Sequence, residues 1–168
     1  LDSIQGDQAN AQLRLHQSQA DQAEAVGNWE AAIAAREAAL KQHPDDQRLI
    51  EQLQKTKAAK QQAQIKELRY KIVQAKEGSN WEAAILATQE YLLLSPDDQE
   101  AKKELALLEV ELHTSKVRTL KSQAEAASKA EKWEEAIQHW QAYLVEKPED
   151  RAKVERLIEQ AKQKAALL

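Results

Sequence analysis

The side chains best suited to chemistry in this sequence are its histidines and carboxylates, and neither group forms a catalytic or metal-binding pattern. The four histidines, His16, His43, His113 and His139, are not paired with a second histidine one helical turn away. The carboxylates alternate with lysines and arginines, which is typical of solvated helix surfaces. Cysteine is absent, and three scattered glycines cannot form a phosphate-binding loop. We therefore expect no enzymatic activity, no cofactor and no metal.

Aromatic residues offer a different chemistry, that of protein recognition. Protein interfaces are enriched in tryptophan and tyrosine, which anchor the contact. Trp140 and Tyr143 lie within one helical turn of each other, and they are the candidate protein-binding residues of the sequence. For Trp140, an interior role, in which it fills a roomier third unit, is favoured over the role of an exposed binding anchor.

Composition limits the kinds of partner and the compartment. The chain has 168 residues, a formal net charge of −4, 42% hydrophobic residues and 31% charged residues. This mildly acidic balance without a basic tract argues against nucleic acid or an anionic membrane as the main partner. No stretch approaches the ~20 apolar residues that cross a bilayer. Absent cysteine is typical of the cytosol and does not exclude export. Since methionine is absent even at position 1, we expect a fragment of a longer protein.

The elements that must position these residues are revealed by an internal repeat. Trp29, Trp81 and Trp133 are spaced 52 positions apart, and the only prolines, at 44, 96 and 148, have the same spacing. Other residues between these markers recur in register, including Ile33, Ile85 and Ile137. The sequence therefore divides into a partial helix at 1–26 and repeats at 27–78, 79–130 and 131–168, the last one truncated. We expect these to form a single repeat array over residues 1–168.

Each repeat is predicted to contain a short helix of ~15 residues and a long helix of ~33 residues. Asn28 and Asn80 precede the short helices as N-caps, whereas Lys132 cannot cap the third, which should fray more. The proline ends the short helix and is expected to begin the long one. Glycine occurs at the other junction, as Gly27 and Gly78.

The short helices resemble the second helix of the tetratricopeptide repeat. In residues 29–44 an aromatic residue begins the helix, small residues follow at Ala32 and Ala39, and Pro44 closes it. The same pattern recurs in the other two repeats, with Tyr91 and Tyr143 at the position of Ala39. The resemblance implies a right-handed solenoid that binds peptides or protein domains. The period differs, because that family repeats about every 34 residues.

The longer period changes the expected architecture. If the turns are tight, successive long helices are staggered by ~28 Å, and each level contains the end of one long helix, a short helix and the start of the next. In the long helix at 97–129, the seam from Ala101 to Leu112 and the seam from Val117 to Ala127 point in different directions. An all-α array in the form of a staggered three-helix rod is therefore favoured over the flush solenoid.

The function predicted from these features is a protein–protein interaction scaffold that binds a protein or peptide. The alternative is a structural spacer or oligomerisation stalk without a specific ligand. Self-association through the long helices would favour that alternative.

Overall fold

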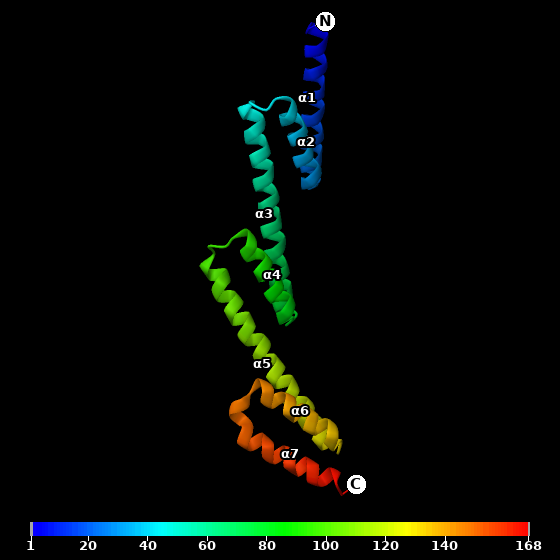
Figure 1. Cartoon of the computed structure of the whole chain (residues 1–168), viewed down its shortest axis with the longest axis vertical. Helices are drawn as coiled ribbons and strands as arrows, with labels where there is room; N and C mark the ends of the chain where they lie inside the picture. Colours follow the sequence, from blue (N-terminus) through cyan, green and yellow to red (C-terminus); the bar gives the residue numbers. More distant parts are fainter. Residues whose placement is uncertain (1, 168) are drawn as a thin grey trace. The chain divides into compact units, whose positions relative to one another are not determined.

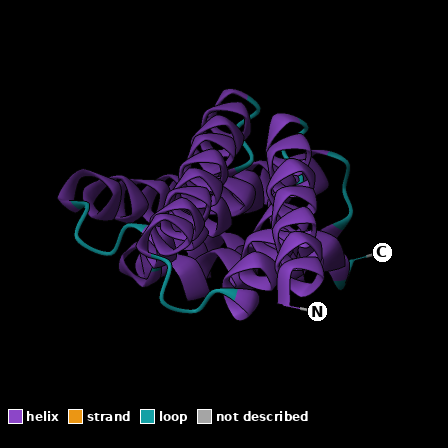
Figure 2. Cartoon of the chain, turned by 90° about the horizontal axis from the view of Figure 1, so that it is seen from above, coloured by secondary structure: helices purple, strands orange, loops and turns teal. Residues whose placement is uncertain are grey.

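The protein consists of helices joined by short loops, and the computed structural model describes residues 2–167 of it (Figures 1 and 2). No strand occurs among these residues, so the predicted all-α class is confirmed. The elements are α1 (Asp2–Ala25), α2 (Trp29–Gln42), α3 (Gln47–Glu77), α4 (Trp81–Leu94), α5 (Gln99–Lys129), α6 (Trp133–Glu146), a 3₁₀ turn η1 (Pro148–Asp150) and α7 (Arg151–Ala165). Within the described range, no helix is both long enough and apolar enough to cross a membrane.

The junctions between α1 and α2, α3 and α4, and α5 and α6 have the same backbone geometry. In each, one residue has a positive φ: 72° at Gly27, 53° at Ser79 and 59° at Glu131. The N–H group of the next residue donates to a carbonyl five positions earlier, at 2.8 to 2.9 Å. This is the Schellman arrangement, which satisfies carbonyls at the end of a helix. Gly78 therefore lies one residue before the left-handed position of its own junction, which Ser79 occupies instead.

The residue after each left-handed position occupies the N-cap position, directly before the next helix. The Asn28 and Asn80 side chains accept hydrogen bonds from the N–H groups of Ala31 and Ala83, at 3.2 and 3.1 Å. Both predicted N-caps are thereby confirmed. Lys132 occupies the equivalent position before α6 and makes no such bond.

The prolines behave differently from the prediction. Pro44 and Pro96 lie in turns, and the long helices begin three residues later, so the expectation that proline starts these helices is wrong. The reason is that an aspartate caps each helix: Asp46 and Asp98 accept hydrogen bonds from the third N–H group ahead, at 3.3 and 3.0 Å. Only Pro148 begins a helical element, the turn η1.

The chain forms two compact units, Leu1–Tyr70 and Lys71–Leu168, with the boundary inside α3. In the first unit, α2 lies against α1 and the first part of α3 (Figure 1). Arg36 of α2 is only 9% exposed, and its Nη2 atom lies 3.0 Å from Asp21 and 2.9 Å from Glu24 of α1. Its Nε atom donates to the Thr56 hydroxyl of α3 at 2.7 Å. A polar network therefore joins three helices at the centre of this unit.

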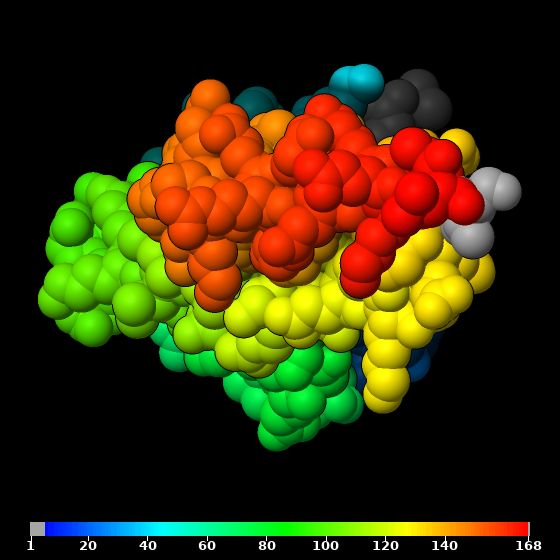
Figure 3. All heavy atoms as spheres, turned by 90° about the horizontal axis from the view of Figure 1, so that it is seen from below, coloured from blue at the N-terminus to red at the C-terminus, as the bar shows by residue number. Residues whose placement is uncertain are grey.

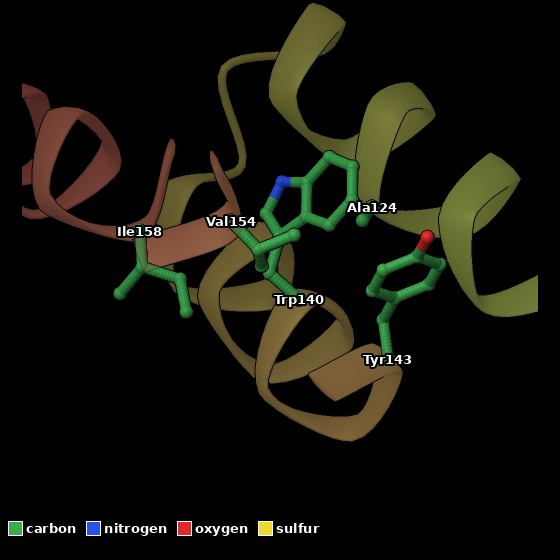
Figure 4. Packing of buried hydrophobic residues seen from close by; sticks show 5 residues of the cluster. All are labelled: Ala124, Trp140, Tyr143, Val154 and Ile158. Atoms are coloured by element: carbon green, nitrogen blue, oxygen red, sulfur yellow. The ribbon is translucent and has the colours of Figure 1, made fainter. Parts of the chain in front are cut away.

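In the second unit, the two halves of α5 pack against different neighbours, as their two apolar seams predict. The first half lies beside α4, where the Tyr91 hydroxyl donates to Asp98 at 2.6 Å (Figure 1). The second half packs against α6 and α7, and Figure 3 shows α7 (orange to red) against this part of α5 (yellow). A hydrophobic core lies between these three helices. Figure 4 shows its buried members, which are Ala124, Trp140, Tyr143, Val154 and Ile158.

Candidate functional site

The two residues predicted to bind protein lie inside the second unit. Trp140 is 5% exposed and Tyr143 is 4% exposed. Their rings meet edge to face, with centroids 5.6 Å apart and an interplanar angle of 83°. Of the two roles considered for Trp140, the structure therefore shows the interior one. A partner would reach these residues only through an opening above them.

Such an opening exists between α5 and α7. It is a groove of about 410 Å³, with Lys121, Glu125 and Ser128 on the α5 side and Lys153, Gln160 and Lys164 on the α7 side. Its floor consists of aromatic residues of α6: Trp133, Trp140 and Tyr143. We call it the α5–α7 groove. Its volume lies in the usual range of ligand-binding pockets, roughly 300 to 1,000 Å³.

One repeat position on the wall of the groove differs from its equivalents. This position is Glu24 in α1, Lys76 in α3 and Ser128 in α5, which are 52 residues apart. Glu24 accepts a hydrogen bond from the Thr56 hydroxyl of the next long helix, and Lys76 forms an ion pair with Glu104 of the next long helix at 2.5 Å. The Ser128 hydroxyl instead donates to the Ala124 carbonyl of its own helix, at 2.8 Å. The side chain that bridges successive long helices at the first two positions is therefore replaced at the groove by one that bonds within α5.

The start of α7 also changes the walls of the groove. Ala101 is buried in α5, but the residue 52 positions later, Lys153, is exposed, and Val154 is buried in its place. The α7 register is thus advanced by one residue, a rotation of about 100° around the helix axis. The 3₁₀ turn η1 leads directly into α7, and Asp150 makes no capping bond like that of Asp98. This difference brings the Lys153 side chain to the groove.

Two lining residues of the groove, Tyr143 and Asp150, shift each other's pKa. The Tyr143 hydroxyl donates to the Asp150 carboxylate. This hydrogen bond raises the pKa of Tyr143 to about 12, with burial and neighbouring carboxylates adding to the effect. The same bond lowers the pKa of Asp150, and Lys147 nearby contributes in the same direction. Tyr143 is therefore neutral and Asp150 negatively charged at neutral pH.

Two other lining residues, Lys164 and Trp133, place a cation over an aromatic ring. The Lys164 Nζ atom lies 4.6 Å from the centroid of the Trp133 ring. Such cation–π contacts stabilise by about 0.5 to 1 kcal/mol at exposed sites. Trp133 is half-buried and lines the groove.

Sequence reasoning selected two residues of the aromatic floor, Trp140 and Tyr143, but not the rest of the site. It did not single out Ser128, Lys153 or Lys164 as site residues. The break in the repeat at position 128, from charged residues to serine, was the signal that could have located the groove.

Comparisons with protein-family models and with curated proteins found no match to this sequence.

Proposed function

We propose that this protein is a protein–protein interaction scaffold and that the α5–α7 groove is one of its docking sites. The observation that carries the proposal is the groove itself, which is lined by Trp133, Trp140 and Tyr143 and lies beside Ser128, where the bridge made by Glu24 and Lys76 at the equivalent positions is replaced by a bond within α5. Aromatic residues at the centre of a concave surface are typical binding anchors.

The resemblance of the short helices to those of tetratricopeptide repeats supports the same class of function. Repeat arrays commonly bind partners along extended surfaces made by successive units. In this chain, each repeat contributes a short helix whose outward residues differ from those of the other repeats. Such variation on a common frame suits binding better than it suits catalysis.

The test is selection of a displayed library of random peptides against the full chain. We expect binders to be enriched and to lose at least about tenfold in affinity for the Ser128→Trp variant, since the indole fills the groove. Gln160→Trp narrows the same groove from the α7 side and should have the same effect.

The matched control is Ser122→Trp, which makes the same substitution at an exposed α5 position outside the groove. Circular dichroism and thermal melting establish that each variant is folded. If no peptide binds, or if binders tolerate both groove variants as well as they tolerate the control, the proposed docking site is wrong.

A second candidate function, an oligomerisation stalk, is favoured by a separate observation. Four large apolar side chains of the second repeat are exposed: Leu86 and Leu93 on α4 at 60% and 82%, and Leu107 and Val110 on α5 at 66% and 60%. The first repeat carries Lys55 at the position of Leu107 and Lys41 at that of Leu93. Exposed apolar patches often mark association sites, and a second copy of this chain would cover these.

Light scattering coupled to size exclusion distinguishes the two functions. A mass above the 19.0 kDa monomer that falls to the monomer value for Leu93→Lys with Leu107→Lys would support the stalk. A monomer at all concentrations would exclude self-association through these residues and leave the scaffold.

A further inference from the structure

The α5–α7 groove is positively charged in a chain that is negatively charged as a whole, with a formal net charge of −4. The ionisable side chains that line it are Lys121, Lys153, Lys164, Glu125 and Asp150. Both carboxylates have partners within the chain: Asp150 accepts from the Tyr143 hydroxyl, and Glu125 lies 3.8 Å from Lys121. Asp150 keeps its negative charge and interacts electrostatically with Lys153, so the net excess is one positive charge, and the lysines that no lining carboxylate pairs at short distance are Lys153 and Lys164 of α7.

The α7 wall has a regular pattern. Lys153, Leu157, Gln160 and Lys164 are spaced by four, three and four residues and so share one helix face. The two lysines are eleven residues apart, which corresponds to about 16 Å along the helix axis. Between them lie an apolar side chain and an amide, which can donate and accept hydrogen bonds. The wall therefore offers a cation at each end and a less polar centre.

The contact between Lys164 and Trp133 is compatible with the binding of an anion by Lys164. The ammonium group lies 4.6 Å from the ring centroid, and an ammonium group has three N–H donors. A ring interacts with only one side of an ammonium group, so other donors of Lys164 are free for an anion. A carboxylate can bind Lys164 while the cation–π contact is kept.

We propose that the groove binds an acidic peptide segment in an extended conformation, with one carboxylate on Lys153, another on Lys164, and an apolar side chain between them over Trp140. The proposal rests on the proposed scaffold function and specifies the partner's chemistry. In an extended chain, residues about five positions apart span roughly 16 Å, which matches the separation of the two lysines. The groove volume of about 410 Å³ admits side chains of such a segment but not a whole helix, whose diameter is about 10 to 12 Å.

The experiment uses the full chain and two fluorescein-labelled capped peptides, with binding followed by fluorescence anisotropy. One peptide carries glutamates about five residues apart with leucines between them, and the other carries lysines in place of the glutamates. We expect the acidic peptide to bind at least about tenfold more tightly than the basic one, with an affinity that falls as salt is added.

The variant Lys153→Glu with Lys164→Glu should weaken the acidic peptide about tenfold or more and should strengthen the basic one. Lys102→Glu with Lys103→Glu is the matched control, because it changes the net charge equally at exposed positions outside the groove. The control should leave the preference for the acidic peptide intact.

Two results would overturn the proposal. Equal binding of the acidic and basic peptides would show that the groove has no preference for acidic peptides. Equal losses of acidic-peptide affinity in the groove variant and in the control would show that the preference comes from the overall charge of the chain. If library selection still yields binders that Ser128→Trp excludes, the scaffold function stands and only the acidic chemistry is wrong. If selection yields no binders, the docking site proposed for the scaffold is itself wrong.

Discussion

At the scale of single residues, one interior position is filled in three different ways. The equivalent residues are Arg36, Thr88 and Trp140. Arg36 forms ion pairs and hydrogen bonds with neighbouring helices, the Thr88 hydroxyl donates to the Ala84 carbonyl of its own helix at 2.8 Å, and Trp140 packs in a hydrophobic core. The same helical frame thus accepts a charge, a hydroxyl or an indole, provided that the neighbouring helices supply matching partners.

The network around Arg36 should be sensitive to the loss of one member. Burial alone would raise the pKa of Glu24, but hydrogen bonds from Thr56 and Arg36, together with the charge of Arg36, lower it. Arg36→Ala leaves this carboxylate charged and without its cation. We expect a loss of about 2 kcal/mol in the free energy of unfolding at neutral pH, less than for a fully buried pair because the Glu24 side chain is 30% exposed.

Hydrogen exchange of the α2 amides measures this effect locally. Lys57→Ala is the control, because Lys57 and Glu37 form an ion pair in which both side chains are 53% exposed. Its loss should change stability by less than about 0.5 kcal/mol. Equal effects of the two substitutions would show that the buried network contributes no more than a surface pair.

The hydrogen bond between Tyr143 and Asp150 predicts a dependence of stability on alkaline pH. The hydrogen bond raises the pKa of Tyr143 from the ordinary value of 10.0 to about 12 in the folded protein. The stabilising contribution is therefore fully present below pH 10 and is lost as the pH rises through about 12. Urea denaturation at a series of pH values measures the free energy of unfolding. At alkaline pH this free energy should fall less in Tyr143→Phe than in the wild type.

Absorbance at the tyrosinate wavelength, followed as the pH is raised, measures the ionisation of tyrosine independently. The ionisation step at the highest pH should disappear in Tyr143→Phe. If the step persists there, it belongs to another tyrosine and the assignment is wrong.

At the scale of helices, the junctions are built to one plan with unequal residues. The left-handed position is glycine at 27, serine at 79 and glutamate at 131. A side chain disfavours this conformation by roughly 1 to 2 kcal/mol. The junction before α6 also lacks a side-chain cap, because Lys132 stands where Asn28 and Asn80 stand in the others.

We predict that Glu131→Gly stabilises the second unit by about 0.5 to 1 kcal/mol, because glycine relieves the strain of the positive φ but adds entropy to the unfolded chain. The measurement is the denaturant midpoint followed by circular dichroism. Glu134→Gly is the control: the same change inside the first turn of α6 should destabilise by about 1 kcal/mol. A lower midpoint for Glu131→Gly would mean that the glutamate side chain stabilises the junction in some other way.

At the scale of the whole molecule, the shape of the array is a prediction from the sequence. The 52-residue period pairs each short helix with a long helix about twice its length, which favours a staggered rod over a flush solenoid. A rod about 100 Å long has a radius of gyration of about 29 Å, whereas a compact domain of this size has about 15 Å.

Solution X-ray scattering coupled to size exclusion checks this prediction. We expect the larger radius at the monomer mass. A radius near the compact value would contradict the stagger and favour the flush solenoid.

The sequence by itself determined the features that depend on local interactions. The spacing of Trp29, Trp81 and Trp133 located the repeats, and Asn28 and Asn80 located the starts of α2 and α4. These features are local because a cap bonds to a backbone group only three residues away. The aromatic residues of the candidate site, Trp140 and Tyr143, could be selected from residue type and from their spacing within one helical turn, which are also local features.

Tertiary structure decided everything that depends on residues far apart in the chain. The burial of Arg36 requires Glu24 and Thr56, which lie 12 and 20 positions away on other helices. The interior place of Trp140 depends on the register of α7, which a short turn advances by one residue. The α5–α7 groove is lined by residues of α5, α6 and α7, which only the packing of these helices brings together. Such outcomes follow from packing between helices, and no local pattern specifies which neighbour a side chain will meet.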